Sequence, residues 1–333
     1  MRSYAVKNMT FRAIRHPMFW VFVFFFFLPY LLPFVGGYTY LGVEVLIWAI
    51  FALGFNIVLG YTGLPSFGHG AFFGIGAFAL ANMQLRLIHG MWIPILTGVV
   101  FAAFFGALVG LFVAKKRGIY FALLTIAFSQ MFWFISWGWD SVTGGEDGIA
   151  GIDRLPVGIP GLFSFDTSDI LHFYYFVYFL FVVCAILTWI IVHSPFGRTL
   201  QAIRYNETRA KCIGYDTALY KWMSFTLSAA FSGLAGGLYA LLRNAAFSDI
   251  MHWTQSGNVL LMVLLGGGMT SFFGPILGAA VFIVLRDLFS TLTQHWYLIY
   301  GLLIMFVIVF IPEGIMSFFK RGEGKRRLLV FEK

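Results

Sequence analysis

The residues of this sequence with the clearest potential for molecular recognition gather in a basic segment, Pro195 to Asp216, between two long apolar runs. At about 100° per residue, apolar side chains fall on one half of a helix and cations on the other. The apolar set is Leu200, Ala202, Ile203, Ala210 and Ile213, and the cations are Arg198, Arg204, Arg209 and Lys211. Gly197, which follows Pro195, and Gly214 predict the two ends of this helix.

Glu207 lies within the apolar half of this helix, where an unpaired carboxylate is costly to bury. We therefore expect a cation on a partner protein to meet it. This interpretation makes the helix a docking element for another protein. The alternative is a peripheral helix on anionic lipid, for which a basic polar face is the usual signature.

Several other kinds of chemistry have no motif in the sequence. The phosphate-binding pattern GxxxxGK followed by Ser or Thr does not occur, so we expect no ATP hydrolysis by that route. The seven His residues show no i, i+4 pairing and no HExxH, so we expect no metal, no cofactor and no enzymatic activity. Glu44, Asp287 and Glu313 lie near predicted span ends, which favours interface anchoring or a local ion pair over ion-coupled transport.

The composition places the chain in a membrane. It has 333 residues, of which 60% are hydrophobic and 11% charged, and its mean hydropathy is +0.86. These values fall outside the range of soluble domains. Long unbroken apolar runs favour helices over a barrel. We therefore predict an all-α, polytopic integral membrane protein that forms a single transmembrane domain over residues 1–333.

About ten membrane segments are predicted, some of them broken or re-entrant. The run at 257–269 is too short to cross a bilayer alone at 1.5 Å per residue. The apolar runs lie near 19–35, 40–59, 66–84, 92–114, 119–138, 173–193, 223–243, 257–269, 272–290 and 296–318.

The charges predict the orientation. With the basic N-terminus in the cytoplasm, the 194–222 loop lies inside and the acidic 139–171 loop lies outside. Counting 257–269 as a crossing keeps the basic C-terminal tail inside as well. We expect a multi-pass protein of the inner cell membrane with both termini cytoplasmic.

Two Gly-interrupted segments are candidates for the wall of a path through the membrane. Irregular backbone at membrane depth is tolerated where protein or a water-filled cavity satisfies its polar groups. The alternative is close helix packing through small residues, which fits equally well. The candidate path residues are Asn56, Gly63, Ser66, Gly68 and His69 in the first segment, and Gly267, Ser271 and Gly274 in the second.

The predicted outer loop contains the acidic turn TGGEDG, which faces the side from which a substrate would arrive. A solvated turn is the alternative interpretation, because Gly pairs favour turns. The candidate residues of the outer loop are Thr143, Gly144, Gly145, Asp147 and Gly148.

The chain resembles, over nearly its whole length, the M-type permease subunits of branched-chain amino-acid ABC transporters. The cytoplasmic coupling loop of that family resembles Gly197, Arg198, Leu200, Ala202, Ile203, Arg204, Asn206, Glu207, Arg209, Ala210, Ile213 and Gly214 in order and spacing. The Gly-rich segment, TGGEDG, GGGMTSFFGPILGAA and PEG match as well. Departures from the family pattern are Leu64, Pro65, Gly70 and Tyr205.

This resemblance implies the importer in which the chain would work. The expected partners are two ATP-binding subunits, a second homologous permease, an extracytoplasmic substrate-binding protein and the lipid bilayer, with no nucleic acid. The expected substrates are leucine, isoleucine, valine or related hydrophobic amino acids. The alternatives are a urea or short-amide ABC permease and a stand-alone ion-coupled carrier.

Overall fold

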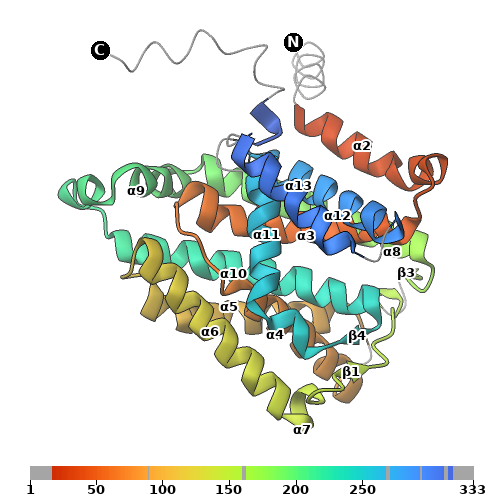
Figure 1. The fold of residues 1–333 in the computed structure, drawn as a ribbon. Helices are drawn as coiled ribbons and strands as arrows, with labels where there is room; N and C mark the ends of the chain where they lie inside the picture. Colours follow the sequence, from red (N-terminus) through yellow and green to blue (C-terminus); the bar gives the residue numbers. More distant parts are fainter. Residues whose placement is uncertain are drawn as a thin grey trace, which may run out of the picture.

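The computed structural model describes residues 17–88, 90–159, 163–267, 271–292, 295–310 and 314–317. Most of them lie in helices (Figure 1). The helical elements are α2 Pro17–Leu31, η1 Leu32–Val35, α3 Thr39–Asn56, η2 Ile57–Tyr61, α4 His69–Arg86, α5 Trp92–Val113, α6 Gly118–Gly138, α7 Asp140–Thr143, α8 Ile170–His193, α9 Pro195–Cys212, α10 Thr217–Arg243, η3 Ser248–Met251, α11 Trp253–Gly266, α12 Gly274–Leu292 and α13 Trp296–Phe310.

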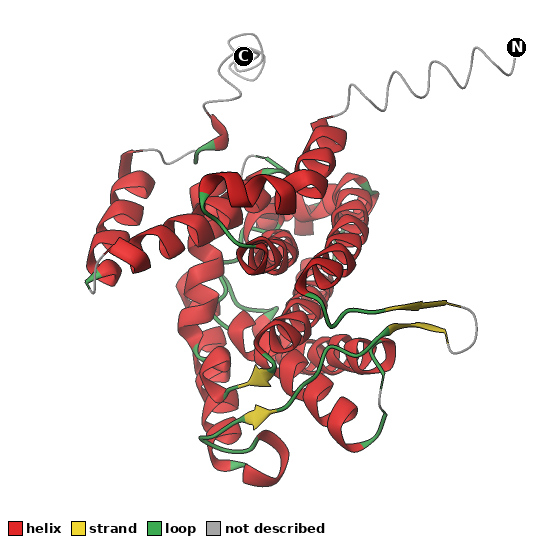
Figure 2. Ribbon diagram, turned by 90° about the vertical axis from the view of Figure 1, so that its right-hand side faces the viewer, coloured by secondary structure: helices red, strands yellow, loops and turns green. Residues whose placement is uncertain are grey.

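Four very short strands accompany the helices. β1 (Ile149–Ala150) pairs antiparallel with β4 (Ala245–Ala246), which ties the 139–171 loop to the end of α10. β2 (Val157–Ile159) pairs antiparallel with β3 (Phe163–Phe165). Figure 2 shows the second pair reaching out from the helices. These strands belong to the 139–171 loop and to the end of α10. The fold is all-α, as predicted.

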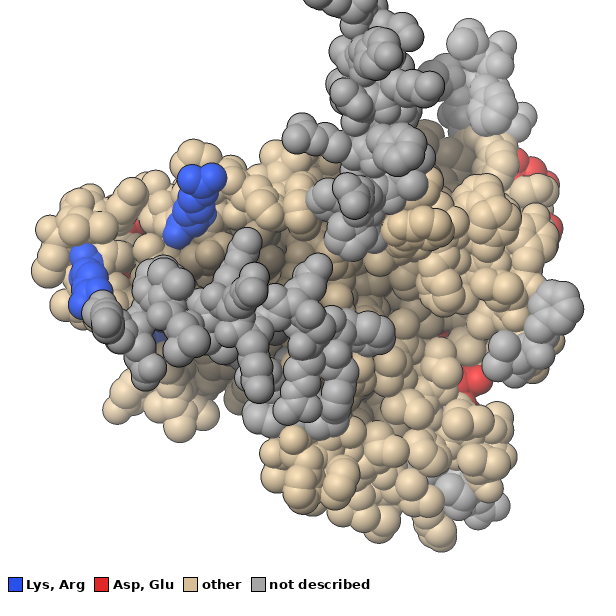
Figure 3. All heavy atoms as spheres, turned by 90° about the horizontal axis from the view of Figure 1, so that it is seen from above, with Lys and Arg blue, Asp and Glu red and all other residues tan. Residues whose placement is uncertain are grey.

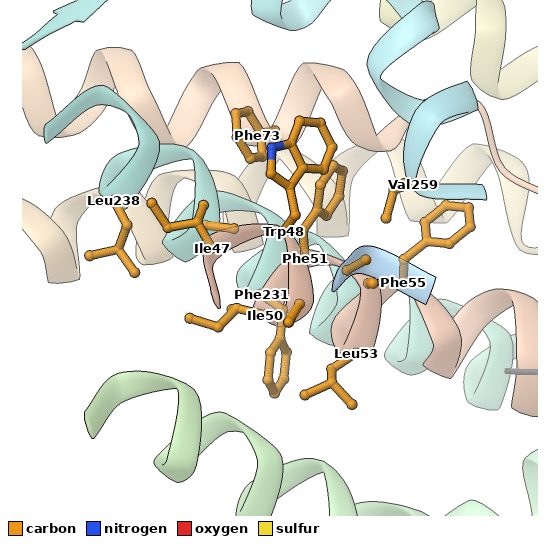
Figure 4. Close-up of a cluster of buried hydrophobic side chains, with 14 of the residues drawn as sticks. Ile47, Trp48, Ile50, Phe51, Leu53, Phe55, Phe73, Phe231, Leu238 and Val259 are labelled. Atoms are coloured by element: carbon orange, nitrogen blue, oxygen red, sulfur yellow. The ribbon is translucent and has the colours of Figure 1, made fainter. Parts of the chain in front are cut away.

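The centre of the molecule is α3, whose side chains are buried from Leu41 to Asn56. A helix that is apolar all round is stable only when other helices surround it. The helices α8, α10 and α12 pack against α3. Figure 4 shows Trp48 and Phe51 of α3 near Phe73 of α4, and the Trp48 and Phe73 rings stack with centroids 5.7 Å apart.

Helices α4, α5 and α10 pack closely around a row of glycines. A Cβ placed on Gly76 of α4 would lie 2.1 Å from the carbonyl oxygen of Gly233 in α10. A Cβ on Gly98 of α5 would lie 2.7 Å from the carbonyl oxygen of Gly76. Such small-residue contacts are how helices approach one another in lipid, where no hydrophobic force drives them together.

Large apolar side chains cover the outer faces of the bundle. Leu96 and Phe112 of α5, Phe134 of α6 and Ile190 of α8 are all more than half exposed. Apolar surface on this scale is not stable in water and marks a membrane-facing surface. The chain is a polytopic membrane protein.

The predicted apolar segments correspond to helices, but their lengths differ. Among the described residues, six helical stretches are long and apolar enough to cross a membrane: Thr39–Tyr61, Trp92–Val113, Gly118–Gly138, Ile170–His193, Thr217–Arg243 and Gly274–Leu292. The segment predicted to be short is α11, with 14 residues, and it runs across the direction of α3 and α10 in Figure 1. The count of ten crossings stays a prediction.

Candidate coupling helix and membrane path

Helix α9 projects from the bundle at the end opposite β3 (Figure 1). Ser194 precedes it, and its Oγ accepts a hydrogen bond from the Gly197 backbone N–H at 3.4 Å. The prediction of one continuous helix is wrong, because the backbone leaves the helical region at Asn206 (φ −160°, ψ 97°). The Asn206 Oδ1 then accepts from the Arg209 N–H at 2.9 Å, as a helix N-cap does. The element is therefore two helical pieces joined at Asn206.

This break decides which side chains of α9 are buried. Leu200, Ile203 and Ala210 are buried against the bundle, as the pattern predicts. Ala202 is exposed, and Ile213 is 68% exposed. The prediction of one apolar face including these two residues is wrong. Ala202 lies at the edge of the predicted apolar arc, about 200° from Leu200 at 100° per residue, and Ile213 lies beyond the last helical turn, which ends at Cys212. Arg198 and Arg209 are exposed, and Gly214 forms the turn that follows.

Glu207 is held by cations of its own chain. Its Oε2 lies 2.5 Å from the Arg117 Nε, and its Oε1 lies 3.3 Å from the Lys221 Nζ and 3.5 Å from the Lys211 Nζ. Thr217 Oγ1 donates a hydrogen bond to the Glu207 Oε1 at 2.9 Å. The inference that a partner protein must supply the cation is therefore wrong. Glu207 ties α9 to the start of α6 and to α10.

The surroundings of Glu207 set its protonation state. Burial alone raises the pKa of this carboxyl group, but the hydrogen bond from Thr217 and the positive charge of Lys221 outweigh burial. The net result is a pKa below the ordinary value. The carboxylate is therefore charged at neutral pH and keeps its ion pairs.

Arg204 connects α9 to the first Gly-rich segment. Its Nη1 donates a hydrogen bond to the backbone carbonyl of Gly60, which is in η2. Its aliphatic stem lies on Gly63, where an added Cβ would come within 2.8 Å of the Arg204 Cγ. Gly63 has φ +77°, a left-handed conformation that disfavours other residues. The candidate docking helix and the candidate path segment therefore touch.

The chain after α3 is irregular, as predicted. Residues 57–61 form a π-helical turn, a feature often found at functional sites. Thr62 Oγ1 donates to the Ile57 carbonyl at 2.8 Å, and Thr125 Oγ1 of α6 accepts from the Phe67 N–H at 3.1 Å. The irregular backbone is thus satisfied by side chains of the protein.

The polar path residues of this segment meet around His69. Its Nδ1 lies 2.9 Å from the Ser66 Oγ, and the same hydroxyl accepts from the Gly68 N–H at 3.3 Å. The rings of Phe55, Phe72 and Phe225 surround the imidazole edge to face, with centroids 5.0 to 5.7 Å away. The structure brings Ser66, Gly68 and His69 together.

This group is closed in the present conformation. Asn56, Ser66 and His69 are no more than 1% exposed. Among the described residues, the buried Asn56 Oδ1 and His69 Nε2 have no hydrogen-bond partner. Close packing, the alternative interpretation of the glycines, applies to Gly70 and Gly74, which lie against the residues just before and at the start of α11.

The second set of path residues lies at the other end of α11. Gly267 ends that helix, and the Ser271 Oγ accepts from the Gly274 N–H at 3.0 Å at the start of α12. Ser256, near the start of α11, lies beside α4, where its Oγ accepts a hydrogen bond from the Gly70 N–H at 2.7 Å. The eleven helical steps from Ser256 to Gly267 span about 16 Å at helical rise. The two predicted sets are thus separated by most of α11.

The outer turn is fixed to the bundle. Thr143 Oγ1 donates to the carbonyl of Ser136 at 2.5 Å and accepts from the Gly145 N–H at 3.4 Å. Ser248 Oγ donates to the Gly145 carbonyl at 3.1 Å. Gly144, Gly145 and Gly148 all have positive φ, and Asp147 is exposed beside them. These hydrogen bonds hold the turn against the bundle, with the Asp147 carboxylate exposed on it.

A family model decides the class of the protein. The model described as the permease component of the branched-chain amino acid transport system matches residues 37–309. The chain belongs to this family. The match includes the path segment, the outer turn and both pieces of α9. The chain is therefore a transporter permease subunit and not an enzyme, a multi-pass protein of the inner membrane that works with ATP-binding and substrate-binding partners.

Individual relatives agree with the family model. The chain is 30% identical to the high-affinity branched-chain amino acid transport permease LivM of Escherichia coli, over 81% of this chain and 68% of the relative. It is 25% identical to a probable branched-chain amino acid permease LivM of Methanocaldococcus jannaschii, over 82% and 92%. A guanosine ABC transporter permease of Bacillus subtilis is 29% identical over 40% of this chain and 44% of its own length. No solved structure matches the chain.

Several residues of the site could not be predicted from the sequence. Arg117 and Lys221 complete the surroundings of Glu207, and Thr125 and Ser256 satisfy the backbone of the path segment. A carboxylate on an apolar helix face is the signal that a cation lies nearby, but the sequence does not say on which chain.

Proposed function

We propose that the chain is the permease subunit of an ATP-driven, binding-protein-dependent importer of leucine, isoleucine and valine. The observation that carries this proposal is the continuous connection from the projecting α9, through Arg204, to the π-helical turn at Gly60. A stand-alone carrier has no need for such a connection. The printed names of the LivM relatives support the substrate class.

The docking role of α9 is supported by what it exposes. Tyr205 is 86% exposed and Ile213 is 68% exposed, next to the exposed cations Arg198, Arg209 and Lys211. Aromatic residues and Arg are enriched in the buried centres of protein interfaces. Two ATP-binding subunits, one on each of two homologous permeases, would cover these surfaces. A helix resting on lipid would place its apolar residues on one face, and the break at Asn206 prevents that.

The orientation we propose puts α9 and both termini in the cytoplasm, with about ten membrane segments. Figure 3 shows Lys and Arg at the end from which α9 projects, and Asp and Glu mainly toward the opposite end. This distribution follows the positive-inside rule. The outer turn with Asp147 would then face the extracytoplasmic substrate-binding protein.

The mechanism follows from these connections. Closure of the ATP-binding subunits would push on α9, and the Arg204 to Gly60 hydrogen bond would transmit the movement to the irregular segment 57–68. Because the packed interior has discrete arrangements, a small push would switch the segment between two states. The buried group around His69 would then open toward one side of the membrane.

The experiment that tests this function uses the complete importer in proteoliposomes. The binding protein is supplied on the side opposite α9, and ATP on the side of α9. Vesicles with ATP should then transport radiolabelled leucine toward the α9 side, and vesicles without ATP should not. Urea supplied in the same way should not accumulate. Accumulation of urea and not of leucine would establish the short-amide alternative instead, and uptake driven by an ion gradient without ATP would establish a carrier.

A further inference from the structure

The turn between α5 and α6 carries three consecutive cations, Lys115, Lys116 and Arg117, and all three are exposed. From Trp92 to Gly138, a stretch that covers both helices and the turn, the sequence contains no acidic residue. Both helices are long and apolar enough to cross a membrane, so the turn lies where the chain leaves the bilayer. It lies at the end of the molecule from which α9 projects (Figure 1).

Buried groups hold this turn in one position. The Lys221 side chain of α10 is only 1% exposed, and its Nζ donates a hydrogen bond to the Lys116 carbonyl at 3.1 Å. The Lys116 N–H donates to the Val113 carbonyl at 2.9 Å. Arg117 pairs with Glu207 of α9. The backbone that carries the cations is therefore fixed, which lowers the entropy lost when a ligand binds them.

Positive charge is in surplus around this turn. Glu207 pairs with three cations, and two of them, Arg117 and Lys211, keep 47% and 55% of their side-chain surface exposed. Lys115 and Lys116 add two more positive charges, and in the described part of the chain their side chains form no ion pair. A fixed surplus of one sign attracts a ligand of the opposite sign. The turn is therefore complementary to an anion.

Apolar side chains continue from the cations along the outside of both helices. Ile119, Tyr120 and Leu123, in the first turns of α6, are 69%, 73% and 56% exposed. Phe112, near the end of α5, is 64% exposed, and its ring packs against Phe128 of α6 with the centroids 5.9 Å apart. Cations directly beside an apolar surface at the end of a membrane span match the phosphate and the acyl chains of a phospholipid.

We propose that the α5–α6 turn binds an anionic phospholipid of the phosphatidylglycerol class. Lys115, Lys116 and Arg117 contact its phosphate, and its acyl chains lie along the exposed apolar side chains of α5 and α6. An acidic segment of a soluble subunit would match the cations but not Tyr120 and Leu123, which belong to a membrane span. In the proposed orientation the turn lies in the cytoplasmic leaflet, where anionic lipids attract cations next to membrane spans. This site is independent of the transported substrate.

The double variant Lys115→Gln/Lys116→Gln tests the site. Neither side chain forms a hydrogen bond or an ion pair in the described part of the chain, and the Lys116 carbonyl that Lys221 binds is kept, so the variant should fold. Arg198→Gln/Arg209→Gln is the matched control. It removes two exposed cations from α9, and so changes the net charge by the same amount.

Native mass spectrometry of the full-length chain, with the subunits that copurify, measures the phospholipids retained in mild detergent. We expect phosphatidylglycerol to bind about tenfold or more weakly to Lys115→Gln/Lys116→Gln than to wild type or the α9 control, and phosphatidylcholine to bind all three alike. Equal binding of phosphatidylglycerol by all three proteins would overturn the site. An equal loss in the α9 control would also overturn it, because net charge alone would then explain binding. Displacement of the lipid by the same concentration of inorganic phosphate would show a site for free anions instead.

A phosphatidylglycerol with a photoreactive acyl chain tests the location. We expect it to label the peptide that contains Ile119 and Tyr120 in wild type, and to label that peptide less in Lys115→Gln/Lys116→Gln. Labelling confined to other parts of the chain, or equal labelling by a photoreactive phosphatidylcholine, would overturn the proposed position. These readouts do not depend on import. An importer that fails to transport leucine would overturn the proposed function and leave the lipid site standing, and loss of the lipid site would leave the proposed function intact.

Discussion

Single residues hold α9 in place, and Glu207 is the clearest case. Its carboxylate accepts a hydrogen bond from Thr217 and pairs with three cations, which lie just before α6, in α9 and in α10. An exposed ion pair contributes little, but a mostly buried carboxylate with several partners contributes more. The apolar position of Glu207 predicted that a cation must meet it. The position of that cation could not be predicted, because Arg117 and Lys221 are distant in the sequence.

Replacing Glu207 with Gln should destabilise the protein by about 1 to 3 kcal/mol at neutral pH, since the hydrogen bonds to charged partners are lost. The folded-state pKa is below the ordinary value of 4.5, so this contribution is complete above pH 4.5 and is lost as the pH falls through the lower folded-state pKa. Thermal unfolding in mild detergent at several pH values measures it. A constant difference between wild type and variant across that range would contradict the network.

Arg204 and Arg198 should behave differently, although both are cations of α9. Arg204→Met removes the hydrogen bond to Gly60, so we expect normal assembly with the ATP-binding subunits but less substrate imported per ATP hydrolysed. Arg198 is exposed, so Arg198→Met should weaken assembly in a salt-dependent way. Copurification and coupled uptake assays separate the two effects. Identical phenotypes would contradict the transmitting role of Arg204.

At the scale of elements, the long apolar helices could be predicted from the sequence and the irregular ones could not. Hydropathy identifies α5, α6 and α8 because their faces meet lipid. The break at Asn206 depends on one side chain that caps the second piece of α9, which a helical wheel cannot register. The irregular segment 57–68 is held by contacts from α6, at Phe67, and from α9, at Gly60, that form only in the folded protein.

The crossing of α4 and α10 provides a prediction at this scale. Gly76→Ala should destabilise the bundle strongly, because the added Cβ would lie 2.1 Å from the Gly233 carbonyl oxygen, and backbone cannot move aside cheaply. Gly138→Ala, at the end of α6, is the control, since its Cβ meets nothing within 4 Å. The midpoint of thermal unfolding in detergent should fall for the first variant alone. An equal response of both would mean that the crossing is looser than the structure indicates.

At the scale of the whole molecule, family membership follows from motifs spread along the chain, and so the class of the protein could be predicted from sequence. The positions of the segments relative to one another in the folded protein could not be predicted from sequence. The two Gly-rich segments are candidates for the wall of a path, with close helix packing as the alternative, and the structure places them at opposite ends of α11. A cavity lined by Trp48 and Arg286 lies between five helices that no local sequence pattern connects.

The orientation of the molecule is testable with its own cysteines. The chain has two, of which Cys184 is buried in α8 and Cys212 is exposed at the end of α9. A membrane-impermeant maleimide should label Cys212 in inside-out vesicles and not in right-side-out vesicles, with Cys212→Ser as the control. Labelling from the outer side would reverse the proposed orientation.

The importer that we propose requires α9 to be the surface on which the ATP-binding subunits dock. The most direct measurement is the rate of maleimide labelling of Cys212 in inside-out vesicles, with and without those subunits, in a Cys184→Ser background. Docking on α9 predicts that the subunits slow labelling markedly and that Arg198→Met restores the rate. An unchanged rate in vesicles where the subunits are shown to be bound would contradict the claim.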